Sequence, residues 1–236
     1  MIKFILILTF CGFLGSCGDD PKILRRQQMT EEGVKNPTTV EEYRDAINKY
    51  KRRIDDISTA HSQVGIWYKI LGSRYLDKQM FGEALKCYEE AIKLYPTNQN
   101  LYYYVGLCAG YMAKSALDYT ATGNTSQRSN YLLLSESAYK RAIELEPRYF
   151  RALYGLGVLY VFEMDKPLEA IPILELACDI EKRNTDAMMV LARAYYMTYD
   201  TASAVAMYDK IIETTKSEER KAEAEANKQA VLNANF

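Results

Sequence analysis

Proline and glycine are scarce in this chain of 236 residues, which contains 6 prolines and 12 glycines. Because both residues disfavour helix interiors, their scarcity is typical of a mainly helical protein. Histidine is scarcer still, since His61 is the only one. A metal site built on histidine pairs is therefore excluded, and no cysteine and histidine lie at metal-ligand spacing.

The chain also lacks an excess of charge of either sign, with 30 basic and 31 acidic residues. A balanced charge gives no attraction to nucleic acid. No glycine-rich phosphate loop follows a strand, because Gly155 and Gly157 fall inside a predicted helix. The sequence predicts no enzyme activity, no cofactor, no metal and no nucleic-acid partner.

Residues 1–16 have the features of a secretory signal peptide. Lys3 precedes an apolar run, Phe4–Leu14, that is shorter than the ~20 residues needed to span a bilayer. The run ends in Leu14-Gly15-Ser16-Cys17, which resembles a bacterial lipobox. This resemblance implies a lipid on Cys17 and attachment to the cell membrane or outer membrane, facing the periplasm or the exterior. The alternative is an ordinary signal peptide with an incidental cysteine. Residues 17–38 are polar and are expected to form a flexible tether.

A recurring pattern of small and large apolar residues is clearest between residues 68 and 96. Their spacing matches one face of each of two successive helices. The members are Tyr68, Leu71, Gly72 and Tyr75, then Ala84, Tyr88 and Ala91, with Pro96 after them. The small residues are expected where the two helices cross closely, and Pro96 is expected to end the second helix.

This pattern resembles the tetratricopeptide repeat (TPR), a helix pair of about 34 residues that stacks into a superhelix. The resemblance implies an all-α fold, an α-solenoid of about four helix pairs with a leading and a capping helix. The TPR domain is expected to span residues 39–236. Its repeats are placed at 65–98, 99–149 with an insertion at 113–130, 150–184 and 185–218.

The two ends of this domain carry helix-capping signals. Thr39 and Glu42 fit a capping box, and apolar residues then recur at helical spacing as far as Ile57. We expect this leading helix to cover the first repeat and to end at a polar junction containing His61; a short coiled-coil dimer is the alternative. Ser217 is expected to cap a closing helix over residues 217–234.

Three cysteines follow Cys17 in the sequence, and they are Cys87, Cys108 and Cys178. Their positions on helix faces favour buried free thiols. A disulfide between Cys87 and Cys108 is the alternative, because their helices are expected to be neighbours.

The resemblance also implies that the first helix of each repeat lines a concave groove. The side chains expected to bind a partner there are mainly aromatic and aliphatic, with two arginines: Tyr103, Leu107, Tyr111, Arg151, Tyr154, Val158, Phe162, Met189, Arg193 and Tyr196. Such a groove suits a peptide or an amphipathic helix. The alternative is that other parts of the protein cover these residues.

The sequence thus predicts a membrane-anchored TPR lipoprotein that acts as a protein-interaction scaffold at the bacterial cell envelope. Two alternatives are an apolar-ligand-binding periplasmic lipoprotein associated with a transporter's substrate-binding protein, and a component of outer-membrane-protein assembly. The identity of the partner, the membrane and the oligomeric state stay open.

Overall fold

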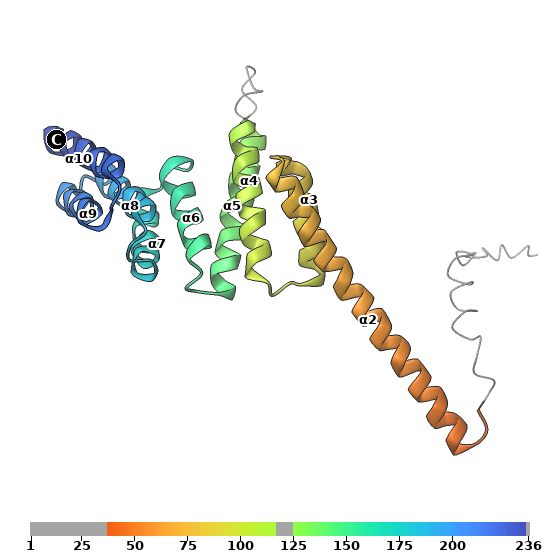
Figure 1. The fold of residues 1–236 in the computed structure, drawn as a ribbon. Coiled ribbons are helices and arrows are strands. Elements are labelled where there is room, and N and C mark those ends of the chain that lie inside the picture. Colours follow the sequence, from red (N-terminus) through yellow and green to blue (C-terminus); the bar gives the residue numbers. More distant parts are fainter. Residues whose placement is uncertain (1–36, 117–124, 235–236) are drawn as a thin grey trace, which may run out of the picture. The chain divides into compact units, whose positions relative to one another are not determined.

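The computed structural model describes residues 37–116 and 125–234 (Figure 1). The signal peptide, Cys17 and nearly all of the predicted tether lie outside these residues. The described residues form nine helices and divide into two units, residues 1–57 and 58–236, which we treat separately. None of the described helices is long and apolar enough to cross a membrane.

Helix α2 (Val40–Asp77) begins at the predicted capping box. The Glu42 amide donates to the Thr39 hydroxyl at 3.2 Å, and the Glu42 carboxylate accepts from the Thr39 amide at 3.0 Å. The Thr38 amide donates to the same carboxylate at 2.7 Å. These hydrogen bonds satisfy amides that have no partner within the helix, and they lower the pKa of Glu42.

The expected break between a leading helix and the first repeat is absent, because α2 continues as one helix of 38 residues. His61 therefore lies within a helix and not in a junction. Residues 58–64 contain neither glycine nor proline. Ser62 donates its hydroxyl to the Ser58 carbonyl at 3.0 Å, one helical turn earlier, so this polar residue is compatible with the helix.

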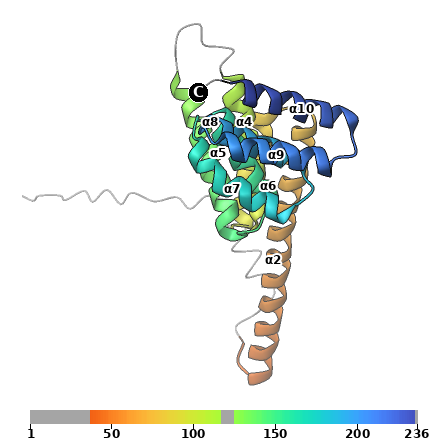
Figure 2. The same cartoon turned by 90° about the vertical axis from the view of Figure 1, so that its left-hand side faces the viewer.

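In the second unit, each helix packs against the next in the chain (Figures 1 and 2). After α2, the described helices are α3 (Phe81–Leu94), α4 (Gln99–Ser115), α5 (Thr125–Leu145), α6 (Phe150–Phe162), α7 (Pro167–Ile180), α8 (Thr185–Met197), α9 (Thr201–Thr214) and α10 (Glu218–Asn233). Helix α4 also contacts α6, and α6 contacts α8, so these three first helices lie beside one another. The all-helical superhelical fold expected from the sequence is confirmed.

Small residues lie where the helices of a pair cross, as expected. A Cβ atom on Gly72 would approach the Tyr88 ring to 3.0 Å, and one on Gly106 would approach the Tyr139 ring to 2.8 Å. On Gly157, a Cβ atom would lie only 2.4 Å from a methyl carbon of Leu174. At these positions the space that a side chain would need is already filled by the second helix of the pair.

The turns inside three of the helix pairs share one backbone feature. Gln79, Asp165 and Tyr199 have φ values of 58°, 52° and 63°, in the left-handed region. A residue in this conformation ends a helix and turns the chain toward the next one. In the first turn, for example, the Met80 amide then donates to the Tyr75 carbonyl at 2.9 Å.

A polar network centred on a buried carboxylate lies beside the core between α5 and α6. Glu136 is 9% exposed and accepts from the Tyr160 hydroxyl at 2.7 Å and from the Lys140 ammonium group at 2.8 Å. The Lys166 ammonium group lies 3.6 Å from the same carboxylate. Burial alone would raise the pKa of Glu136, but these hydrogen bonds and positive charges outweigh it and lower the pKa.

Part of the predicted insertion, residues 113–130, is helical. Helix α4 ends at Ser115, and α5 begins at Thr125. Residues 117–124 lie outside the described part of the chain. Near the start of α5, the Arg128 guanidinium group donates to the Glu163 carboxylate at 2.8 Å. This contact with the end of α6 holds the first turns of α5, and no local sequence signal indicates it.

Candidate functional site

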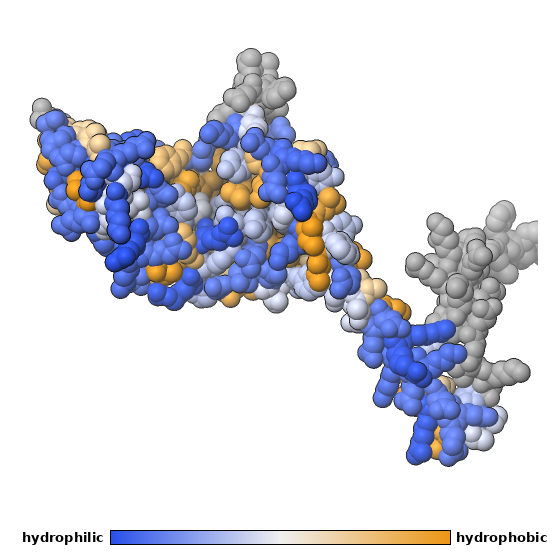
Figure 3. Space-filling model, in the orientation of Figure 1, coloured by the Kyte–Doolittle hydropathy of each residue, from blue (hydrophilic) through white to orange (hydrophobic). Residues whose placement is uncertain are grey.

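The ten predicted groove residues lie on α4, α6 and α8, the three neighbouring first helices of the second unit. None of the ten is buried. Tyr111, Arg151, Phe162 and Arg193 are exposed, while the remaining six are partly buried. The side chains thus remain accessible on one row of helices. Figure 3 shows apolar surface on this unit, interspersed with polar residues.

An aromatic cluster with an arginine joins α4 to α6. The Arg151 guanidinium carbon lies 5.0 Å from the centre of the Tyr103 ring. The Tyr103 ring contacts the rings of Tyr104 and Tyr149 edge-on, at centroid distances of 5.1 and 5.9 Å. Burial raises the pKa of Tyr103, whereas the positive charge of Arg151 acts in the opposite direction. This cluster combines a flat aromatic surface with an accessible positive charge.

A small cavity of about 230 Å³ opens beside this cluster, between α4, α5 and α6. Leu107, Tyr111 and Val158 from the predicted set line it. Its walls are mostly apolar, while Lys114 and Glu163 add one charge of each sign. The cavity can therefore accept an apolar group and offer charged neighbours to polar atoms beside it.

The site also contains residues of a second helix, which lie outside the predicted set. Ser135 and Tyr139 line the cavity from α5. The Ser135 hydroxyl donates to the Gly106 carbonyl at 2.7 Å and is fully buried. Their spacing of four residues places Ser135 and Tyr139 on one face of α5, and this was the available signal.

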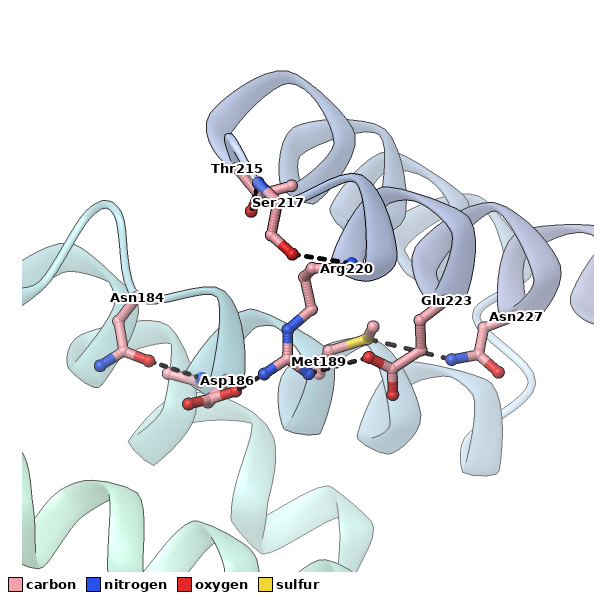
Figure 4. Close-up of polar contacts among 9 residues, drawn as sticks. Asn184, Asp186, Met189, Thr215, Ser217, Arg220, Glu223 and Asn227 are labelled. Atoms are coloured by element: carbon pink, nitrogen blue, oxygen red, sulfur yellow. Dashed lines mark hydrogen bonds and ion pairs between the residues drawn. The ribbon is translucent and has the colours of Figure 1, made fainter.

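The fourth repeat presents a different surface, because α10 contacts it (Figure 4). Arg220 of α10 forms an ion pair with Asp186 and another with Glu223, the second at 2.9 Å. The Asn227 amide group lies 4.0 Å from the Met189 sulfur atom. The closing helix thus engages Met189, one of the predicted partner-binding residues. The accessible part of the candidate groove lies mainly on α4 and α6.

A further apolar surface lies at the start of the second unit. Val64, Trp67, Ile70 and Leu71 of α2 are all exposed and line an open cavity of about 400 Å³. Leu71 belongs to the repeat pattern, which predicted it on the face toward α3, but it is exposed. Val64, Trp67 and Ile70 lie outside that pattern. A tryptophan outside that pattern was the available signal.

The described residues contain no group of three or more metal-ligating side chains. Cys87, Cys108 and Cys178 are buried free thiols. Burial raises the pKa of Cys108 to about 12 and that of Cys178 to about 11. Their thiolate forms are therefore scarce at neutral pH, and the thiols pack as small apolar groups.

Comparisons with known proteins match two segments of the chain. Two tetratricopeptide-repeat models match the chain, one at residues 66–98 and the other at residues 186–214. A TPR repeat-containing protein of Borreliella burgdorferi is 21% identical over 225 residues, which cover 93% of this chain and 95% of the relative.

Solved structures show the same fold. MamA superposes with a TM-score of 0.55 at 21% identity, over 79% of this chain and 99% of MamA. YrrB, described as a TPR protein with an unusual peptide-binding site, superposes with a TM-score of 0.54 at 18% identity, over 87% of this chain and 88% of YrrB.

Two segments of the chain thus match tetratricopeptide-repeat models, and its fold matches that of solved TPR structures. Proteins built from such repeats are generally scaffolds for protein–protein interaction.

Proposed function

We propose that the chain is a scaffold that binds a peptide or an amphipathic helix of another protein in the groove formed by α4 and α6. The observation that supports this most strongly is the accessible cluster of Tyr103 and Arg151 beside the cavity. Aromatic residues and arginines dominate the energetics of protein interfaces. The likeness to YrrB supports the proposal further, since that protein is described as having a peptide-binding site.

The size of the cavity favours a peptide over a whole small molecule. Pockets that enclose drug-sized ligands usually measure about 300–1,000 Å³. The cavity between α4, α5 and α6 measures about 230 Å³ and is open to solvent. This volume suits one apolar side chain of a partner, whose backbone would extend along the groove toward Phe162.

Site-specific crosslinking in cells would test the groove. A photoreactive amino acid replaces Val158, which lines the cavity, and in a matched variant it replaces Leu168 on α7, which is 71% exposed. We expect a defined partner to be captured from position 158 and not from position 168. Capture of the same proteins at equal yield from both positions would contradict the proposal.

Binding of the captured partner to purified variants then locates the contacts. Phe162→Ala removes an exposed ring from the predicted groove, and Leu168→Ala removes an exposed side chain from a second helix. Because anchor residues in interfaces often contribute about 2 kcal/mol, we expect Phe162→Ala to weaken binding about tenfold or more. Leu168→Ala should leave the affinity unchanged, and equal effects of both variants would place the interface elsewhere.

We further propose that the chain is a lipoprotein, attached to the cell envelope through Cys17. The support is the apolar run Phe4–Leu14 followed by the lipobox-like Gly15-Ser16-Cys17. Growth with an alkyne-bearing fatty acid should label the protein, and Cys17→Ser should abolish the label. Labelling that persists in Cys17→Ser, or an unlabelled wild-type protein, would refute the lipid anchor. Neither result would bear on the proposal that the groove binds a partner.

A further inference from the structure

Apolar side chains form a regular heptad repeat along the first part of α2, in the unit that ends at residue 57. The side chains follow one another at alternating spacings of three and four residues: Val40, Tyr43, Ile47, Tyr50, Ile54 and Ile57. Five of them, all except Tyr50, are between 53% and 69% exposed. We call this stripe the α2 seam.

The width of the α2 seam indicates what fits on it. The apolar residues occupy only the a and d positions of the heptad, beginning with Val40 at a. A stripe limited to these positions is narrower than the face by which a helix joins a globular core, and it is characteristic of a helix that packs against one other helix.

Three of the four positions on either side of the α2 seam are basic. The flanking e and g positions are Arg44, Ala46, Lys51 and Arg53. The Arg53 guanidinium carbon lies 5.7 Å from the centre of the Tyr50 ring, so its charge is held next to the seam. In coiled coils, residues at e and g form the ion pairs that select the partner.

All acidic residues of this stretch lie on the remaining positions b, c and f: Glu41, Glu42, Asp45, Asp55 and Asp56. A second copy of the chain would therefore bring no acidic group to the basic flanks in either orientation. In an antiparallel pair, Arg44 and Lys51 of one copy would approach the same residues of the other copy. These like charges would repel one another.

The charge balance also disfavours a lipid surface as the occupant. Residues 40–57 contain five basic and five acidic residues, so the helix has no net charge that would attract it to anionic lipid. Membrane-surface helices instead combine a broad apolar face with a strongly basic polar face.

We propose that the α2 seam is a docking site for a single helix of a partner protein, with an apolar heptad stripe and acidic residues at its flanking positions. This site shares no residue with the groove on α4 and α6. It would let the chain hold two proteins, one in the groove and one on α2.

Two synthetic three-heptad peptides provide the test. Both have isoleucine and leucine at a and d, but one has glutamate and the other lysine at e and g. Binding to the purified full chain is followed by fluorescence anisotropy of the labelled peptide. We expect the glutamate peptide to bind about tenfold or more tightly at ~0.05 M salt, and the difference to shrink at ~0.5 M salt as the charges are screened.

Variants of the full chain assign this binding to the seam. The pair Ile47→Asp and Ile54→Asp should abolish binding of both peptides, with an unchanged helical circular-dichroism spectrum because both residues are exposed. Reversing Arg44, Lys51 and Arg53 to glutamate should make the lysine peptide the tighter ligand. Reversing Asp45 to lysine, on the opposite face, is the matched control and should change neither affinity.

Three outcomes would overturn the proposal. One is equal affinity for the two peptides, or binding of neither. Another is a dimer of the full chain, seen by sedimentation, that dissociates in the Ile47→Asp variant. The last is binding to phosphatidylglycerol vesicles that is lost in the same variant, which would make the helix a membrane-surface element.

Discussion

Replacing Gly157 by alanine should destabilise the repeat stack, although alanine is the better helix former. In a helix interior the exchange by itself stabilises by about 1 kcal/mol. The new Cβ atom, however, would lie 2.4 Å from one carbon of Leu174 and 2.5 Å from another. Carbon atoms attract one another only beyond about 3.5 Å.

The size of the effect follows from these two opposing terms. Leu174 is fully buried, so it cannot turn out toward solvent. Overpacking a filled site costs about 1–3 kcal/mol, and a contact this short belongs at the upper end of that range. After the gain in helix propensity is subtracted, we expect a net loss of about 2 kcal/mol. The melting temperature should fall by about 4–8 °C.

Gly110→Ala is the matched control, because it makes the same exchange inside another first helix. Its Cβ atom would lie 3.6 Å from the Ser135 hydroxyl oxygen, an ordinary contact. We expect this variant to gain about 0.5–1 kcal/mol. Urea unfolding followed by circular dichroism measures both changes, and a Gly157→Ala protein as stable as the wild type would refute the reasoning.

A double-mutant cycle identifies the clash as the cause. Leu174→Ala alone should cost about 2–5 kcal/mol, since it leaves a cavity in the core. In the double variant, the new Cβ atom at position 157 occupies space that the Leu174 side chain has left empty. The combined loss should therefore be smaller than the sum of the two single losses by about 1 kcal/mol or more. Additive losses would show that Gly157 is needed for a reason other than Leu174.

Two further predictions concern a turn and the buried network. Gln79→Gly should stabilise the fold by about 0.5–1 kcal/mol in the same urea assay, because a φ of 58° strains a residue with a side chain. Gln79→Val should destabilise the fold. A valine variant more stable than the glycine variant would contradict the backbone strain. Glu136 has a lowered pKa in the folded state, so its contribution is present above its ordinary pKa of 4.5 and is lost as the pH falls through the lower folded value. The stability of Glu136→Gln should therefore vary less with pH in that acidic range than that of the wild type, and parallel curves would argue against the network.

The helix pairs could be read from the sequence because the pattern is local. Tyr68, Gly72, Ala84 and Tyr88 mark helix faces by their spacing, and the structure packs a Cβ-free Gly72 against Tyr88 as expected. The capping signals at Thr39 and Ser217 were equally readable, because a cap involves residues only three positions apart. Local spacing thus determined most of the helix boundaries.

Features that depend on distant contacts were not readable in this way. The sequence of residues 58–63 is mostly polar, which suggested a junction. Polar residues are equally acceptable in a solvent-exposed helix. The start of α5 depends on Arg128 reaching Glu163, which is 35 residues away. The contact of Met189 with Asn227 likewise depends on how α10 packs against α8, and no spacing rule indicates it.

The three buried thiols divide the stack into separately observable segments. Cys87 lies on α3, Cys108 on α4 and Cys178 on α7, and all three are shielded from solvent. A thiol-specific reagent can modify each one only while its surroundings are open. The order and rate of modification in the folded protein would therefore record which repeats open first, without any label being introduced. The native sequence thus carries its own reporters of whether the stack opens from one end or as a single cooperative unit.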